Sequence, residues 1–285
     1  MKPACFLKCF FTIVLWAILH ESGFAQISLS PTALFIRDDT FLGELYISNP
    51  SENDLLEVTV YPEFGYPAPG PDGSLMMVSH DTLRAATSCF ASQLRIFPRS
   101  FLLLPRQLQV VRLQVRPIRE KPDQAYFTRI IVSSGLQSRE TGMTLDDKED
   151  NARVRYVFRQ NIPAFFLKGE VNTGINISHM ETDWDNVGLK LWTDLIPTGN
   201  APFLGSLSVS LVDDNQKKAA IHQQSVAIYV EGRFRFDIPM QKDQVSPGQY
   251  TLECLFETRR GDISANDLIQ AHPVVFRKKM EIGQP

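Results

Sequence analysis

The sequence predicts an all-β protein made of two immunoglobulin-like β-sandwich domains. Apolar and polar residues alternate with the period of two that is typical of strands with one buried face, and no long segment shows the 3.6-residue period of a helix. The alternating segments form two sets, before and after about residue 170. At 285 residues one large or two ordinary domains are expected, and the hydrophobic fraction of 44% is sufficient for real cores.

Residues 1–25 are predicted to be a cleaved signal peptide. Two lysines precede an apolar run at residues 9–19, and Gly23 and Ala25 are small residues at the expected cleavage positions. The run is too short for a membrane span, which needs roughly 20 apolar residues. We therefore expect export to the periplasm, without insertion in a membrane.

The charge of the mature chain excludes a nucleic-acid partner. Removing Lys2, Lys8 and Glu21 from the totals of 29 Lys+Arg and 32 Asp+Glu leaves a net charge of −4. A protein that binds nucleic acid would show a basic domain instead.

The first sandwich is expected in residues 26–168. About seven segments alternate there, which is the strand count of an immunoglobulin-like domain. They are residues 27–36, 41–48, 56–61, 94–98, 109–115, 125–134 and 152–167. Pro and Gly residues predict a loop at 63–74, and a polar, charged sequence predicts a long connection at 136–151.

The second, smaller sandwich is expected in residues 172–285. The clearest alternation of the chain is found there, where Leu207, Val209 and Leu211 are separated by serines. The other strands of this domain are expected at 189–195, 233–238, 250–256 and 272–282.

Two cysteines remain after the leader is removed, Cys89 and Cys254. An interdomain disulfide is one alternative, since exported proteins meet oxidising conditions. The favoured alternative is a small buried thiol, because Cys254 alternates inward with Leu252 and Phe256.

The sequence contains no motif that indicates catalysis or a bound cofactor. The histidines are not spaced as shared metal ligands, and phosphate-loop, dinucleotide and nucleophile-elbow patterns are missing. The acidic segment 181–186 can be interpreted as a calcium loop, but it lacks the glycine and the terminal Glu of one, which favours an acidic turn between strands. We expect no enzymatic activity, no catalytic residue, no metal and no cofactor.

One segment, 97–113 (FPRSFLLLPRQLQVVRL), carries a resemblance to a known family. The Gln-x-Val-Arg-Leu motif of periplasmic pilus chaperones of the chaperone–usher pathway is matched by Gln109, Val111, Arg112 and Leu113. Arg106 stands where that family has a turn glycine. Further matches are residues 27–32, residues 47–50, Tyr126 and Arg129. The chain resembles a divergent branch of this PapD-like family over about residues 26–168.

The resemblance implies that the protein donates a strand to its partner. Such a chaperone lends the last strand of its first domain to a pilus or fimbrial subunit that lacks one, and delivers the subunit to an outer-membrane usher. Backbone hydrogen bonds give the affinity, and alternate side chains fill pockets. The matching strand here is 152–159, in which Ala152, Val154, Tyr156 and Phe158 share one face. Periodicity alone favours a row that faces its own core, whereas the resemblance favours a row exposed on an edge strand.

The resemblance also implies a basic pair that anchors the C-terminal carboxylate of the subunit. The matching positions hold Ala33 and Pro163, neither of which can bind a carboxylate. The candidate substitutes are Arg112, Arg129, Arg155 and Lys168, and Arg129 is the first choice. Each of them can instead be a solvated or structurally paired cation.

Two other functions fit the same pattern of strands. The first is a structural or adhesive surface protein built from such sandwiches, without a client. The second is a carbohydrate-binding module that presents Trp184 and Trp192 to a sugar.

Overall fold

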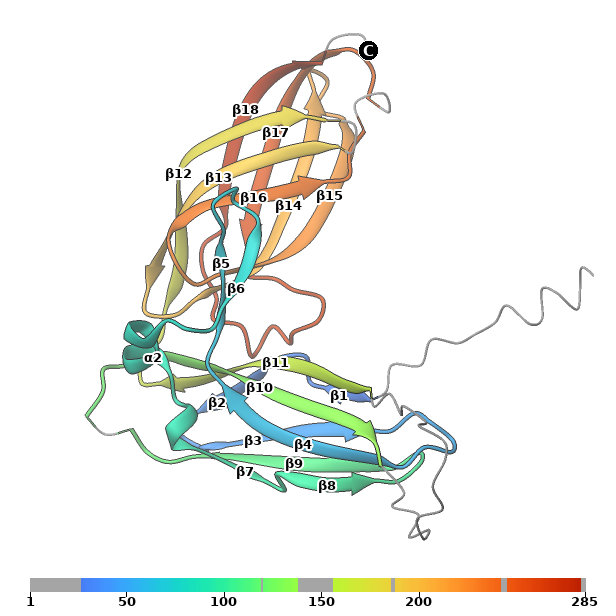
Figure 1. Ribbon diagram of the computed structural model, residues 1–285. Helices are drawn as coiled ribbons and strands as arrows, with labels where there is room; N and C mark the ends of the chain where they lie inside the picture. The colour runs from blue at the N-terminus through green and yellow to red at the C-terminus, as the bar shows by residue number, and fades with distance from the viewer. Residues whose placement is uncertain (1–26, 119, 138–155, 186–187, 242–244, 283–285) are drawn as a thin grey trace, which may run out of the picture.

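The computed structural model describes residues 27–118, 120–137, 156–185, 188–241 and 245–282 (Figure 1). Their regular structure is almost entirely strand, arranged in two sandwiches, so the predicted fold class is confirmed. The predicted signal peptide lies outside the described residues. The domain boundaries stay a prediction; in the structure β11 (Val157–Lys168) ends the first sandwich and β12 (Thr173–Trp184) begins the second.

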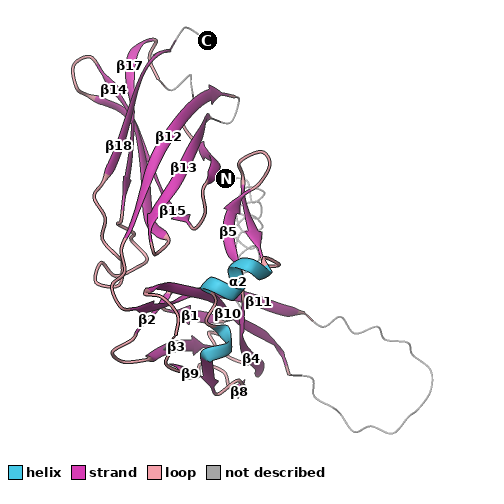
Figure 2. Cartoon of the chain, turned by 90° about the vertical axis from the view of Figure 1, so that its left-hand side faces the viewer, coloured by secondary structure: helices cyan, strands magenta, loops and turns pink. Residues whose placement is uncertain are grey.

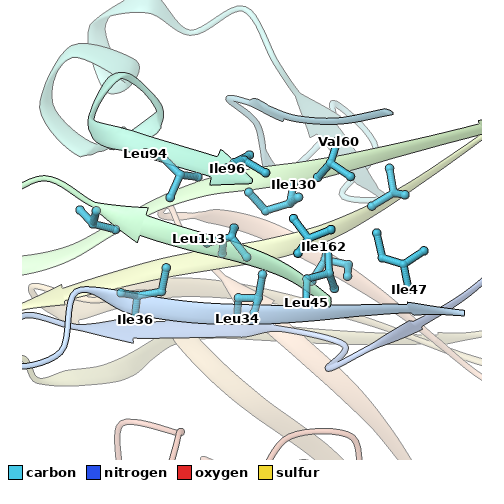
Figure 3. Packing of buried hydrophobic residues seen from close by; sticks show 14 of the residues in the cluster. Leu34, Ile36, Leu45, Ile47, Val60, Leu94, Ile96, Leu113, Ile130 and Ile162 are labelled. Atoms are coloured by element: carbon cyan, nitrogen blue, oxygen red, sulfur yellow. The ribbon is translucent and has the colours of Figure 1, made fainter. Parts of the chain in front are cut away.

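The first sandwich consists of a four-stranded and a five-stranded sheet. The smaller sheet has the order β1-β3-β9-β7, with β1 (Ser28–Ser30), β3 (Leu42–Ser48), β9 (Leu108–Val115) and β7 (Leu94–Phe97). The larger sheet has the order β2-β11-β10-β4-β8, with β2 (Leu34–Arg37), β10 (Gln124–Leu136), β4 (Leu56–Glu63) and β8 (Ser100–Leu103). Figure 3 shows Leu45, Leu113 and Ile162 in the core between the two sheets, where all three are buried. Apolar residues at every second position of each strand thus produce one continuous core.

The second sandwich consists of a three-stranded and a four-stranded sheet. The smaller sheet has the order β12-β13-β16, with β13 (Leu189–Gly199) and β16 (Gly232–Ile238). The larger sheet has the order β15-β14-β17-β18, with β15 (Lys218–Ile228), β14 (Phe203–Asp213), β17 (Gly248–Glu257) and β18 (Val274–Ile282). Figure 1 shows this sandwich standing above the first, on the side where β10 and β11 lie.

The first predicted strand, 27–36, was wrong as a single element. The structure divides it into β1, which pairs with β3, and β2, which pairs with β11 in the opposite sheet. Pro31 lies between them, and since proline has no N–H to donate, a ladder is easily interrupted there.

The predicted loop at 63–74 was wrong for Tyr66–Pro69, which form a strand. The structure has a hairpin of β5 (Tyr66–Pro69) and β6 (Leu75–Val78) at this place. The Gly70 N–H donates to the Ser74 carbonyl at 2.8 Å. Because hydrogen-bonded and non-bonded pairs alternate along an antiparallel ladder, Pro67 and Pro69 fall at positions whose missing N–H would point away from β6.

Two further details differ from the sequence-based expectations, and a third falls mostly outside the described residues. The helix α2 (Thr82–Ser88) was not expected, because seven residues are too few to show a helical period. Asp81 caps it, since its carboxylate accepts from the Arg84 N–H at 2.9 Å. Residues 181–184 belong to strand β12 and not to a turn. Most of the predicted connection at 136–151 lies outside the described residues.

Both cysteines are free thiols, so the interdomain disulfide is not formed. Cys254 is buried with its neighbours on β17, and this burial raises its pKa to about 12. Among the described residues, no helix has the length and apolarity that would let it cross a bilayer.

Arg106 lies in the turn between β8 and β9 with a φ of +57°. This left-handed conformation favours glycine, since a side chain there meets the following carbonyl. The turn has therefore kept a backbone shape suited to glycine, although the residue is arginine.

Candidate partner-binding edge and interdomain cleft

Half of β11 has an open edge. β11 pairs with β10 along its whole length, from Val157 opposite Gly135 to Lys168 opposite Gln124. On its other side β2 pairs only with Ala164–Leu167. The Gln160 side chain donates to the Ile27 carbonyl at 3.3 Å, but on this second side no strand of the described chain pairs with β11 before Ala164. The backbone of the first half of β11 is therefore available to another strand.

The predicted partner-binding row is exposed at this open half and buried at the other. The exposed fraction is 67% for Tyr156 and 48% for Phe158, whereas it is 3% for Ile162 and 1% for Phe166 in the same alternating row. The other two members of the predicted row, Ala152 and Val154, lie outside the described residues. The described part of the predicted row is therefore exposed, and the buried residues of the same face lie further along β11.

An apolar cluster joins the two sandwiches at the far end of β11. Phe127 and Phe165 of the first domain pack against Tyr229 of the second, with ring centroids 4.9 and 6.2 Å away. Burial raises the pKa of the Tyr229 hydroxyl. The Arg84 guanidinium also donates to the Tyr229 carbonyl at 2.7 Å. These contacts place the second sandwich directly above the sheet that contains β11.

A cavity of about 140 Å³ lies in this cleft, and it contains both positions at which the resemblance implies a basic residue. Ala33 and Pro163 line it together with Arg129, which stands directly opposite Pro163 in the pairing of β10 with β11. Arg260 of the second domain also lines it, and sequence reasoning did not single this residue out. The cations of the cavity therefore lie on the neighbouring strand β10 and in the second domain, and not at the implied positions Ala33 and Pro163.

The two arginines differ in how they are paired. Arg260 donates to both carboxylate oxygens of Asp262, at 2.9 and 2.6 Å. Arg129 has no carboxylate within 4.0 Å among the described residues, and its Nη1 lies 2.7 Å from the Met77 sulfur. Burial lowers the pKa of Arg129, with smaller opposing effects from Tyr229 and Glu63. A half-buried guanidinium without a carboxylate partner is suited to bind an anion from outside.

The structure does not bring the other candidate cations to this cavity. Arg112 lies on β9 in the opposite sheet, where its side chain is 76% exposed and its Nε lies 3.7 Å from Glu44. The Lys168 ammonium lies 2.6 Å from Asp123. Arg155 is outside the described residues.

The β5–β6 hairpin is the part of the site that the sequence did not predict. Figures 1 and 2 show it rising from the first sandwich and lying beside the second, with α2 at its foot. At its tip the Gly73 carbonyl accepts from the Arg235 N–H at 2.7 Å, and Asp72 accepts from the Arg235 guanidinium at 2.6 Å. Hydrogen bonds from Ser74, and then the charge of Arg235, lower the pKa of Asp72 to about 2. The apolar run Leu-Met-Met-Val after a Pro-Asp-Gly turn was the signal that could have indicated a hairpin.

The alternative of a carbohydrate-binding module assumed two exposed tryptophans. Trp184 and Trp192 are both only partly exposed, and Trp184 packs against the core of the second sandwich. No group of three or more His, Cys, Asp or Glu residues that could hold a metal ion is found in the described parts of the chain.

Comparisons with solved structures find distant likenesses to fimbrial chaperones. The chain is similar to the class 5 fimbriae chaperone CfaA, with 12% identity and a TM-score of 0.44 over 88% of this chain and 98% of that one. It is similar to the SafB chaperone in complex with SafA pilin of Salmonella enterica, with 14% identity and a TM-score of 0.42 over 88% of this chain and 95% of that one. It is similar to a chain of the CsuC–CsuE chaperone–tip subunit complex of Acinetobacter baumannii, with 11% identity and a TM-score of 0.43 over 88% of this chain and 98% of that one. No family model and no curated protein matches the sequence. A likeness at such identities concerns the fold alone.

Proposed function

We propose that this protein is a periplasmic chaperone that binds a pilus or fimbrial subunit by donating a strand, and that passes the subunit to an outer-membrane usher. It has no catalytic role in this proposal. It is exported through its signal peptide and belongs to a divergent branch of the PapD-like family.

The open half of β11 is the observation that carries the proposal. An edge strand with free backbone groups and exposed apolar side chains invites aggregation, and proteins ordinarily cover such edges or place charges on them. Here Tyr156, Val157 and Phe158 are all exposed at the start of the strand. A subunit that lacks a strand would pair with this edge and accept alternate side chains in its groove.

The cleft cavity, at the inner end of the open edge of β11, is a suitable binding site for the C-terminus of the subunit. A strand that pairs with Val157–Pro163 ends beside Pro163, and Arg129 stands directly opposite that residue. We propose that Arg129 binds the terminal carboxylate, in the role that the family gives to other positions. Arg112 has no part in this site.

The proposal is tested by the double substitution of Tyr156 and Phe158 by Asp. Burial of these two side chains in a partner contributes roughly 1.5–3 kcal/mol each, so their loss corresponds to at least about a 100-fold weaker complex. The measurement is the amount of subunit that co-purifies with the chain on co-expression, followed by titration of the purified pair.

Val157→Asp is the matched control. It introduces one negative charge, of the same kind as the two in the double variant, at a neighbouring exposed position on the opposite face of the strand. We expect a much smaller loss of subunit binding for this variant. Equal binding by the wild-type chain and the double variant would reject the donated strand.

A further inference from the structure

The β5–β6 hairpin exposes three consecutive apolar side chains on one strand. The exposed fractions are 60% for Leu75, 48% for Met76 and 47% for Met77. Single exposed apolar residues are normal on protein surfaces, but neighbouring ones on one face mark an interaction site. Leu75 and Met77 are such neighbours, whereas Met76 points to the other face of the strand. Within the described residues, β6 pairs with β5 alone, so its outer edge is open as well.

Docking of the hairpin onto the second domain does not account for this exposure. The hairpin uses other residues for that contact: Tyr66 and Ala68 are buried in the interdomain cluster, and Asp72 and Gly73 bond to Arg235. Leu75 and Met77 lie outside these contacts and remain open to solvent with the hairpin already docked.

Register places Leu75 and Met77 on one face of the hairpin. Pro69 stands opposite Leu75, and Pro67 stands opposite Met77. These are the non-bonded pairs of the ladder, so the N–H and C=O groups of Leu75 and Met77 point to the open edge of β6. This edge therefore offers apolar side chains and backbone groups together.

The same face continues into the cleft cavity. Pro67 and Met77 line that cavity together with Arg129 and Pro163, and the Met77 sulfur lies 2.7 Å from Arg129 Nη1. Pro163 lies at the inner end of the open edge of β11. A subunit that follows β11 into the cleft meets the hairpin next.

We propose that the Leu75–Met77 edge of the hairpin is a second contact surface for the same subunit, separate from the donated strand. This inference rests on the proposed function, since it takes the occupant of β11 as its partner. The chemistry that it recognises is an apolar, extended segment of the subunit other than the strand that pairs with β11. Methionine is unbranched and polarisable, so Met77 can adapt to subunits of different sequence.

The inference is tested by photocrosslinking in cells that express the full chain and its subunit. The photoreactive residue p-benzoylphenylalanine replaces Phe158, Leu75 or Met77 in three separate variants. The adduct at Phe158 defines the subunit by its mass. Ile221 on β15, which is 64% exposed in the second sandwich, is the control position. We expect adducts of the same mass at Phe158, Leu75 and Met77, and none at Ile221.

The possible outcomes separate the two proposals. An adduct at Phe158 without one at Leu75 or Met77 overturns the hairpin contact and leaves the donated strand standing. Adducts at the hairpin positions without one at Phe158 overturn both, because the shared partner is then lost. Leu75→Asp gives a second measurement: it should weaken the purified complex at least tenfold, with an unchanged unfolding midpoint, and an unchanged affinity contradicts the inference.

Discussion

Truncation of two phenylalanines on the same face of β11 should have very different effects on stability. Phe166 is 1% exposed in the core of the first sandwich, and Phe158 is 48% exposed at the open end of the strand. Removal of a buried Phe side chain lowers the free energy of unfolding by about 3–5 kcal/mol, because the apolar burial is lost and a cavity remains in the core. Phe158 leaves no enclosed cavity, so Phe158→Ala should lower the free energy of unfolding by only about 1 kcal/mol.

Urea unfolding of the wild-type chain and the two variants provides the measurement. A change of midpoint at an unchanged slope, in the transition that belongs to the first sandwich, reports the stability of that domain. Ile162→Val, at an intermediate position of the row, should cost about 0.5–1.5 kcal/mol and serves as a scale. If Phe158→Ala lowers the free energy of unfolding by about 3 kcal/mol or more, as truncation of a buried Phe does, then Phe158 packs into its own domain. The reasoning about a donated row would then fail.

Three other outcomes are expected. Arg129→Ala should weaken the subunit complex by about tenfold or more without unfolding the protein, since a hydrogen bond to a charged group contributes about 1.5–3 kcal/mol; loss of stability in its place would make Arg129 a structural cation, and calorimetric titration beside thermal unfolding distinguishes the two. Arg106→Gly should change the free energy of unfolding by less than about 0.5 kcal/mol, whereas Arg106→Val should lower it by about 1–2 kcal/mol, because a β-branched residue is disfavoured at positive φ; equal effects in urea unfolding would contradict this. The pKa of Asp72 is lowered in the folded state from 3.8 to about 2, so its contribution to stability is present above pH 4 and is lost as the pH falls toward 2. Asp72→Asn should therefore remove part of the acid dependence of the unfolding midpoint in this window, and an identical pH profile would refute the tip contact.

The order of apolar and polar residues alone predicted most of the strand positions. In β14 and β17, Leu207 and Leu252 lie where the alternation predicts, and both are fully buried. Side chains of a strand point to opposite faces at successive residues. Burial of one face therefore produces an alternation of apolar and polar residues that can be recognised in the sequence. The resemblance in 97–113 likewise depends on local spacing, and the turn at Arg106 adopts the backbone shape that the spacing implies.

Sequence-based predictions of secondary structure were wrong where the local pattern fits more than one structure, as at β5 and α2. The prolines of β5 predict a loop, yet each occupies a position at which the ladder needs no N–H. The seven residues of α2 are too few to show a helical period. The prediction of a loop at 63–74 therefore lost the hairpin, and with it the Met77 contact to Arg129.

The open edge and the position of Arg129 in the cleft were decided by pairings between residues far apart in the chain. The alternating row of β11 has the same period at Phe158 and at Ile162, so no periodicity can distinguish the exposed half from the buried half. The difference arises because β2 covers only Ala164–Leu167, which is a matter of where another strand begins. In the same way, Arg129 became the cation of the cleft because the register of β10 with β11 sets it opposite Pro163. The sequence determined that a strand with an apolar row exists; the tertiary structure determined which half of it is free to meet a partner, since the free half is defined by the strands that stop short of it.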